Sequence, residues 1–380
     1  YEKQLQFKQQ QVFDNLSRIG KVALPPFRPI AGAPADKWYR NKLEYTFSSR
    51  EFIPPGQFHK EDRGAGDRNV LGFHAKGFFD KVVNIEECWL QGDPTNELRN
   101  SLRQFAWDQG LSFYDYKAHT GLLRNLLVRT AATGEVMVNV VFGTAGQAEE
   151  REAVLQFIAG RFPHITTLLY TINEKKNDSL FDLEPVAWRG KGYIIEQLED
   201  FRFKIGPKSF FQTNTAQAEE LYRITRAFAE LDGSQVLYDL YCGTGSIGIF
   251  CSRGAKKIVG VEVIDAAVRD AHENAALNGI GHAAFFAGDV IDVCTDAFFA
   301  EHGRPDVVIT DPPRAGMHDK LVQKILDIGA PTVVYVSCNP ATQARDLAGL
   351  DARYAVTAVQ PVDMFPHTHH IENVVQLKLR

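Results

Sequence analysis

The feature that most constrains the fold is a change of pattern after Gly206, where short apolar runs begin to alternate with helical patterns. Such alternation of strands and helices predicts a parallel, doubly wound sheet. Two further strand-like runs, 356–360 and 374–379, close the chain with no helix between them, which predicts an antiparallel pair at one edge. The fold class expected is therefore α/β for residues 206–380. The alternating runs are Val236–Leu240, Ile258–Val261, Ala284–Phe286, Val307–Ile309 and Thr332–Val336.

The first half of the chain has a different pattern, with one helix followed by strands. Apolar residues spaced near a period of 3.6 predict a helix over residues 1–20, and the proline-rich stretch 25–34 ends it. Alternating apolar and polar residues predict a half-buried strand over Lys42–Ser48. The runs 126–130 and 136–141 flank a Thr-Gly turn and predict a hairpin.

We therefore expect three parts along the chain. These are an N-terminal helix and linker (1–28), a central strand-rich α+β domain (29–205) and a larger α/β domain (206–380). Within the central part, the polar and glycine-rich stretch Pro54–Asn69 is predicted to be a mobile loop.

Composition narrows the class of protein. Hydrophobic residues make up 44% and charged residues 23%, which is ordinary for a globular protein with a sizeable core. No stretch approaches the roughly 18 apolar residues of a membrane span, and five irregularly spaced cysteines predict a reducing, cytoplasmic compartment over a disulfide scaffold. The net charge of −5 gives no global electrostatic case for nucleic-acid binding. A weak basic excess over residues 1–205 fits a solvated face as well as an RNA contact.

A glycine-rich turn follows the first apolar run, within the segment Asp239–Gly248. Its glycines Gly243, Gly245 and Gly248 satisfy the pattern G-x-G-x-x-G. Glycines there allow close approach of a ligand, either a pyrophosphate or the amino-acid end of S-adenosylmethionine. Glu262 ends the next strand and could accept ribose hydroxyls of either cofactor. The turn alone therefore leaves open a dinucleotide, S-adenosylmethionine and a tight turn that binds nothing.

Two further strand ends carry reactive side chains. Asp311-Pro-Pro-Arg314 follows a buried strand, and its rigid prolines would hold a carboxylate at the ligand crevice. Cys338 ends the next strand before Asn339-Pro340, where a cysteine near a helix N-terminus can act as a nucleophile. The alternatives are a simple strand-terminating turn and a small buried thiol, which is the usual role of a cysteine.

Six ordered motifs give the sequence its resemblance to the RNA uracil-C5 methyltransferases, a family with ribosomal RNA and transfer RNA enzymes. The similarity covers nearly the whole chain and is densest over residues 206–380. It implies a Rossmann-like, S-adenosylmethionine-dependent methyltransferase domain there, with a smaller RNA-binding domain over 29–205. The motifs are Phe210–Asn214, Asp239–Gly245, Val261–Glu262, Asp311–Gly316, Ser337–Pro340 and Asp363–Glu372.

The resemblance also implies roles for individual residues. Cys338 matches the catalytic nucleophile and Glu372 the general base, while Asp311 and Arg314 would position the uracil or stabilise charge on its ring oxygens. Ser246 stands at a cofactor-contacting position that is asparagine in some relatives, and Asp289 falls near the adenine. The cofactor-binding positions are matched by Gln212, Tyr241, Gly243, Ser246, Glu262, Asp289 and Asp311.

Chemistry explains why this reaction needs a thiol and a carboxylate. The uracil C5 carbon is a poor nucleophile, and thiolate addition at C6 turns the ring into an enolate that can attack a sulfonium methyl group. The C5 proton must then be removed so that the thiol can leave, which a carboxylate such as Glu372 can do. Without its flanking motif, Glu372 would be interpreted as a surface residue preceding a strand.

Metal binding is expected only in a longer form of the protein. The spacing of His367, His369 and His370 fits no standard zinc site, so histidines lining an RNA or base pocket are the better interpretation. Ribosomal RNA enzymes of the family hold a [4Fe–4S] cluster with an upstream cysteine-rich segment and a cysteine that matches Cys88. A cluster needs four thiolates, so we expect Cys88 to be an orphan ligand in a piece that begins after that segment; the alternative is a buried thiol in a clusterless branch.

The leading expectation is uracil-C5 methylation in 23S ribosomal RNA by a monomeric protein, with the target base flipped out of its stack. A transfer RNA substrate is the alternative. Methylation of an exocyclic amine is disfavoured, because that chemistry places an aromatic residue where Arg314 stands and has no use for Cys338. RNA cytosine-C5 methylation, a nicotinamide oxidoreductase and a non-enzymatic RNA-binding factor fit the intact motifs less well.

Overall fold

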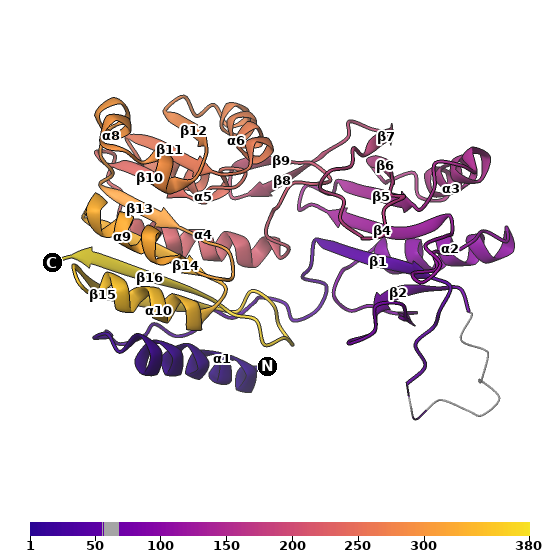
Figure 1. The fold of residues 1–380 in the computed structure, drawn as a ribbon, viewed down its shortest axis with the longest axis horizontal. Coiled ribbons are helices and arrows are strands. Elements are labelled where there is room, and N and C mark those ends of the chain that lie inside the picture. Colours follow the sequence, from indigo (N-terminus) through magenta and orange to yellow (C-terminus); the bar gives the residue numbers. More distant parts are fainter. Residues whose placement is uncertain (55, 57–67) are drawn as a thin grey trace. The chain divides into compact units, whose positions relative to one another are not determined.

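The computed structural model describes every residue except 55 and 57–67, so most of the loop predicted over Pro54–Asn69 lies outside the described residues (Figure 1). The chain forms two compact units, which we describe one at a time. The first unit contains Tyr1–Asp36, Gln197–Lys204 and Ser209–Arg380. The second contains Lys37–Glu196 and Ile205–Lys208.

The first unit is built on a seven-stranded sheet in the order β12-β11-β10-β13-β14-β16-β15. The strands from β12 to β14 in this order are parallel, and β16 is antiparallel to both of its neighbours. Each predicted apolar run forms a strand, and the predicted antiparallel pair lies at the edge. The strands are β10 (Val236–Leu240), β11 (Lys257–Glu262), β12 (Ala283–Ala287), β13 (Val307–Thr310), β14 (Thr332–Ser337), β15 (Tyr354–Val362) and β16 (Glu372–Leu379).

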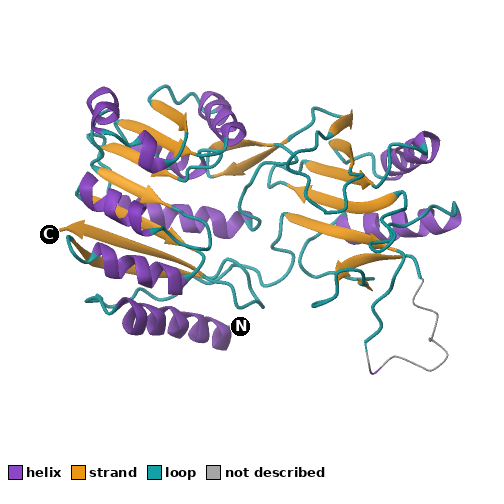
Figure 2. Ribbon diagram, viewed as in Figure 1, coloured by secondary structure: helices purple, strands orange, loops and turns teal. Residues whose placement is uncertain are grey.

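Helices cover both faces of this sheet (Figure 2). On one face, Leu321 of α9 and Leu347 of α10 share a buried cluster with Tyr238 and Val375 of the sheet. On the other, Gln376 donates a hydrogen bond of 2.7 Å to a carbonyl of α4, because successive strand residues point to opposite faces. In the part of the chain that the structure describes, no helix has the length and apolar character of a bilayer span. The helices are α4 (Thr215–Ala229), α5 (Ser246–Phe250), η4 (Ser252–Gly254), α6 (Asp265–Leu277), α7 (Val290–Val293), α8 (Asp296–His302), α9 (Asp319–Ile328) and α10 (Pro340–Leu350).

The N-terminal helix and linker, expected over residues 1–28, pack within this unit, whose first segment is Tyr1–Asp36. Helix α1 (Glu2–Asn15) continues into a π-type turn, η1 (Leu16–Gly20). Val12 and Leu16 belong to the same core as α10, beside which α1 lies in Figure 1. Gly20 approaches α10 so closely that a Cβ atom there would stand 3.2 Å from the Ala344 carbonyl oxygen. The apolar stripe of α1 is thus buried against the α/β unit.

The second unit is a seven-stranded sheet in the order β3-β2-β1-β4-β5-β6-β7. The predicted hairpin forms between β4 and β5, and β6 runs parallel to β5. Leu102 of α2 and Ile158 of α3 cover one face and pack on Tyr45, Val128 and Val138. The elements are β1 (Lys42–Ser48), β2 (Val70–His74), β3 (Val82–Asn84), α2 (Thr95–Asp108), β4 (Leu123–Thr130), β5 (Val136–Phe142), α3 (Ala148–Arg161), β6 (Thr167–Ile172) and β7 (Val186–Arg189), while β8 (Ile194–Leu198) and β9 (Phe201–Ile205) pair in a separate two-stranded sheet.

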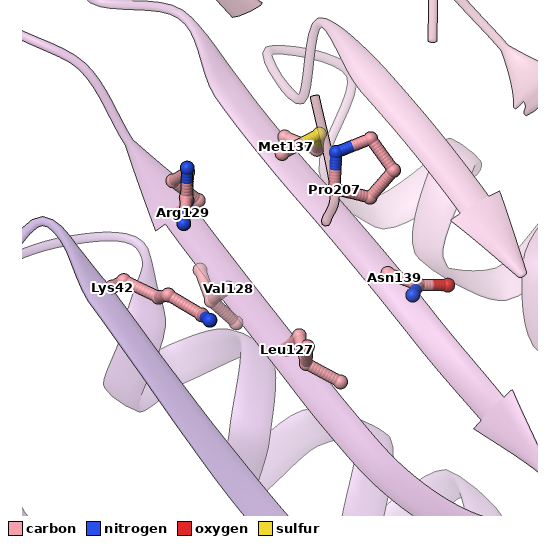
Figure 3. A pocket seen from close by; sticks show the side chains of 7 residues that line it. All are labelled: Lys42, Leu127, Val128, Arg129, Met137, Asn139 and Pro207. Carbon is pink, nitrogen blue, oxygen red and sulfur yellow. The ribbon is translucent and has the colours of Figure 1, made fainter. Parts of the chain in front are cut away.

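A small pocket lies against this sheet (Figure 3). Lys42 and Arg129 are cross-strand partners on β1 and β4, so two like charges stand opposite each other. Burial lowers the pKa of Lys42 and brings the pKa of Arg129 to about 10. The pocket is therefore basic, although part of its wall is apolar. Its lining residues are Lys42, Leu127, Val128, Arg129, Met137, Asn139 and Pro207.

Candidate active site

The predicted site residues gather at the carboxyl ends of the parallel strands of the first unit. Leu240 of β10 pairs with strands on both sides, opposite Val261 and Thr310. The strand order reverses between β10 and β13, and ligands of open α/β sheets bind at such a point, beyond the carboxyl ends of the strands. Asp311 directly follows β13 and Cys338 directly follows β14, so both lie at the carboxyl ends of these strands. The topology therefore places the predicted cofactor loop and the predicted catalytic residues along one rim.

The glycine-rich turn after β10 adopts a backbone that favours glycine. Tyr241, Gly243 and Gly245 have φ angles of 62°, 54° and 77°, in the left-handed region that residues with a Cβ rarely adopt. A Cβ atom at Gly245 would stand 3.0 Å from the Phe285 ring and 3.1 Å from the Ala271 Cβ. Both conformation and space thus favour glycine at this position, whereas Tyr241 adopts the left-handed region although it carries a Cβ atom.

Two carboxylates fix this turn. The Gly248 N–H donates to Asp239 Oδ2 at 2.8 Å, so Asp239 holds the start of α5 against β10. Glu262 Oε2 accepts the Gly243 N–H at 3.1 Å, and its Oε1 accepts the Ile264 N–H at 3.0 Å. Burial raises the pKa of Asp239 to about 7. Asp239 was not predicted as a site residue from the sequence, although its position at the start of the glycine motif indicates a role in holding the turn.

The other predicted cofactor residues lie on separate segments. Ser246 begins α5, and its hydroxyl stands 2.9 Å from the Tyr222 hydroxyl. Asp289 is exposed at the start of α7, where its side chain caps the helix. Gln212 is half-buried just before Asn214, the residue that caps α4. Their roles in cofactor binding stay predictions.

The predicted nucleophile and base face each other across two paired strands. Ser337 at the end of β14 pairs with Asn373 of β16 in an antiparallel register, so the next residue, Cys338, lies opposite Glu372. Cys338 is half-buried, and Glu372 is only 6% exposed. Glu372 is therefore a buried residue that begins β16, unlike the surface residue that the sequence without its motif would suggest.

The Asp311–Arg314 turn is tied to the segment that carries Cys338. Asn339 Nδ2 and Thr342 Oγ1 donate to the Arg314 carbonyl oxygen at 3.2 and 3.3 Å. Asn339 also caps α10 through its Oδ1 atom. One asparagine thus fixes both turns, which keeps Asp311 and Cys338 in a set relation.

Four side chains form one electrostatic cluster. Burial raises the pKa of Glu372 well above its ordinary value, Asp311 raises it further, and Arg314 opposes both effects. Burial alone raises the pKa of Asp311 to about 7. The Cys338 thiol has its pKa raised to about 11 by burial and then by the two carboxyl groups, again opposed by Arg314. Burial therefore disfavours the charged form of each of these three acidic groups in the free protein, and Arg314 opposes this effect at Glu372 and Cys338.

The expected iron-sulfur cluster of a longer form finds no set of ligands around Cys88 among the described residues. Cys88 is buried, and Asn96 bonds both its N–H and its carbonyl oxygen at 2.9 and 3.1 Å. Across the described residues, no three His, Cys, Asp or Glu side chains are grouped as a metal site would require. His367 lies within hydrogen-bond distance of Gln4 and 3.3 Å from a carboxylate oxygen of Asp36, both in the first unit, and its role at an RNA or base pocket stays a prediction.

Two family models match parts of the chain that contain the predicted site residues. Residues 299–380 match the model described as tRNA (Uracil-5-)-methyltransferase, and residues 224–333 match the methyltransferase small domain. The first match covers Asp311, Cys338 and Glu372, and the second covers the glycine-rich turn.

Whole-chain relatives extend the similarity to both units. An uncharacterized RNA methyltransferase of Bacteroides thetaiotaomicron is 51% identical over 382 residues, which cover all of this chain and 84% of the relative. One of Porphyromonas gingivalis is 49% identical over 99% of this chain and 82% of the relative. The crystal structure of Pyrococcus abyssi tRNA (uracil-54, C5)-methyltransferase with S-adenosyl-L-homocysteine superposes with a TM-score of 0.78 at 29% identity, over 99% of this chain and 83% of that one.

Proposed function

Because the chain belongs to the family of RNA uracil-C5 methyltransferases, we propose that it methylates C5 of a uridine in 23S ribosomal RNA, with Cys338 as nucleophile and Glu372 as general base. The observation that carries these roles is the position of Cys338 opposite the buried Glu372, beside Asp311 at the ligand edge of the sheet. Methylation of an exocyclic amine would leave a thiol in this position without a task.

S-adenosylmethionine is the cofactor that we propose for the glycine-rich turn; when bound, it supplies an electrophilic methyl group. The residues fit it. A Cβ at Gly243 would meet nothing within 4 Å, so the backbone there is open to a ligand. The Glu262 carboxylate accepts two N–H groups and keeps lone pairs for ribose hydroxyls. Gln212, Tyr241 and Asp311 would complete the site, with Asp289 near the adenine.

The protein's own groups then divide the reaction into two steps. The Cys338 sulfur bonds to uracil C6 as a thiolate, which places electron density on C5. After C5 is methylated, Glu372 accepts the C5 proton, the electrons of the C–H bond form the C5–C6 double bond, and the thiolate leaves C6. Arg314 favours the thiolate, since it lowers the pKa of Cys338, and it could also stabilise charge on the ring oxygens.

The second unit is the part that we propose binds RNA. Its support is the pair of cations, Lys42 and Arg129, at the pocket of Figure 3, because phosphate contacts supply much of the affinity for RNA. The preference for 23S over transfer RNA rests on the resemblance of Asp363–Thr368 and Cys88 to the ribosomal RNA enzymes.

We expect a stable covalent complex when uridine is replaced by 5-fluorouridine. Fluorine at C5 cannot leave as a proton, so the second step stops and the methylated adduct persists. The measurement uses fluorinated 23S ribosomal RNA and fluorinated transfer RNA in parallel, read by denaturing gel and intact mass. Unsubstituted RNA is the control and should give 5-methyluridine without an adduct. An adduct with transfer RNA only would reverse the substrate assignment, and none with either would overturn the uracil-C5 chemistry.

Gly245→Ala should weaken cofactor binding at least about tenfold, because the new Cβ must displace Phe285 and because alanine resists the left-handed backbone. Isothermal titration with S-adenosylhomocysteine measures the effect. Gly279→Ala is the matched control: Gly279 has a φ of 65° and no atom within 4 Å of its Cβ position. It should cost about 1 kcal/mol of stability with an unchanged Kd. Equal losses of affinity in both variants would refute a cofactor role for the turn.

A further inference from the structure

The connection that leads to Glu372 is held by a buried charge cluster. Val362 ends β15 and pairs with Glu372 at the start of β16, so residues 363–371 form a loop closed at its base by the two strands. Asp363 opens the loop and is fully buried. Its Oδ1 accepts from Lys8 Nζ at 2.6 Å, and its Oδ2 accepts from the Tyr1 hydroxyl at 2.6 Å.

Helix α1 supplies contacts further along the same loop. Lys8 Nζ donates a second hydrogen bond to the Phe365 carbonyl oxygen at 3.0 Å. The His367 N–H donates to Gln4 Oε1 at 3.1 Å, and the Gln4 amide also meets the His367 ring. Successive turns of one helix thus follow the loop from Asp363 to His367.

Helix α4 fixes the loop backbone on its other side. Asn214 Nδ2 donates to the Met364 carbonyl oxygen at 2.9 Å, and Gln217 Nε2 donates to the Asp363 carbonyl oxygen at 2.7 Å. The Asp363 N–H is satisfied by the Ala31 carbonyl oxygen at 2.8 Å. Both backbone groups and both carboxylate oxygens of Asp363 are therefore engaged.

The same N-terminal segment also packs on the helix that follows the nucleophile. Val12 and Leu16 share a core with Ala344 of α10, and α10 begins two residues after Cys338. The segment therefore contacts α10, which follows Cys338, and the loop, which precedes Glu372. The second reaction step requires a fixed distance between Cys338 and Glu372.

The stability of the fold does not by itself explain why Lys8 and Asp363 form a buried ion pair. Lys8 is 4% exposed and Asp363 is 0% exposed, and removing two charges from water offsets most of the attraction that they gain. Apolar side chains of similar size would stabilise the fold at least as well. A charged pair does fix one geometry, because its hydrogen bonds are directional.

We propose that Lys8 and Asp363 are positioning residues, which hold the 363–371 loop so that the Glu372 carboxylate meets the C5 proton of the uracil. This inference rests on the proposed roles of Cys338 and Glu372. It predicts that loosening the loop slows proton removal and leaves the addition of Cys338 and the methylation of C5 intact.

The test follows the two steps separately on unsubstituted RNA. In Lys8→Met and Asp363→Asn, elimination should slow about ten- to a hundredfold, since a displacement of about 1 Å can cost that much. The methylated adduct should then accumulate on ordinary uridine, while adduct formation and the KM for RNA change less than about twofold. Lys8→Arg, which keeps a donor and a charge, should restore part of the elimination rate.

Two control variants separate positioning from general damage. Lys3→Met makes the same change at an exposed position of α1 and should leave both steps unchanged. Ile325→Val loosens the buried core through α9 and should lower thermal stability without accumulation of adduct. If Lys8→Met does not fold, Tyr1→Phe serves in its place, because it removes one hydrogen bond to Asp363 and leaves the ion pair in place; a smaller accumulation is expected.

The outcomes distinguish the inference from the proposed function. Glu372→Gln is the reference, since it removes the base itself. If Glu372→Gln accumulates adduct and the Lys8 and Asp363 variants do not, the positioning role is overturned and the proposed chemistry stands. If Glu372→Gln gives no adduct, the proposed function fails first. The positioning role would also be overturned if Lys8→Met and Asp363→Asn lowered the rates of adduct formation and of elimination equally. The same holds if Ile325→Val accumulated as much methylated adduct as these variants.

Discussion

Cys338→Ala is expected to lower the rate of 5-methyluridine formation by at least about 10⁴-fold, because no other group can replace the thiolate that activates C5. The fluorinated RNA adduct should disappear as well. Stability should change by less than about 1 kcal/mol, since the side chain is half-buried and ends a strand whose backbone pairing it does not alter. Quantitative nucleoside mass spectrometry measures the product, and chemical denaturation measures the stability.

Cys294→Ala provides the matched control. Cys294 is fully buried in the core of the same unit, and burial raises the pKa of its thiol to about 11, as it does for Cys338. The loss of a buried sulfur should cost about 1–2 kcal/mol of stability and leave the adduct unchanged. If Cys338→Ala kept more than a tenth of wild-type activity, the thiol would not be the nucleophile, and methylation of an exocyclic amine would become the better interpretation. The two variants thus compare a thiol at the sheet edge with a thiol in the core, and the pKa of both thiols is raised to about 11.

Much of the first unit could be predicted from the sequence because its signals are local. The apolar run Thr332–Val336 predicts a strand, and the observed strand β14 extends only one residue further, to Ser337. The signal is clear because a strand buried on both faces is apolar throughout. The carboxyl ends of parallel strands meet at one edge, so Asp311 and Cys338 could be placed in the same site before any coordinates. Family resemblance supplied Glu372, for which the local pattern gave no signal.

Long-range pairing could not be predicted. Nothing near Lys8 or Asp363 indicates that they meet, because they are separated by 355 positions and each alone is typical of a solvated surface. The packing of α1 could not be predicted for the same reason: helical periodicity shows that α1 has an apolar stripe, but not which surface covers it. The pKa values of the cluster also depend on burial that only the packed structure defines.

Glu372→Gln should lower the rate of product formation by about 10³-fold, the usual contribution of a general base, and should trap the protein on RNA that contains no fluorine. Glutamine has nearly the same shape but cannot accept the C5 proton, so the reaction stops after C5 is methylated. The trapped species should show the mass of the protein, the RNA and one methyl group. Glu230→Gln, at the surface beside Lys378, should trap nothing and keep full activity.

The pH dependence gives an independent check on the same residue. Burial and Asp311 raise the pKa of Glu372, and burial with both carboxyl groups raises that of Cys338 to about 11. Both groups act in their deprotonated forms and both have raised pKa values, so wild-type kcat should rise with pH above neutrality, toward the Cys338 pKa of about 11. The Glu372 carboxylate disfavours the thiolate, and Glu372→Gln removes that charge. The pH limb for adduct formation should therefore move to lower pH in the variant, even though turnover falls. A limb that stays in place would mean that Glu372 does not face Cys338 in the working enzyme.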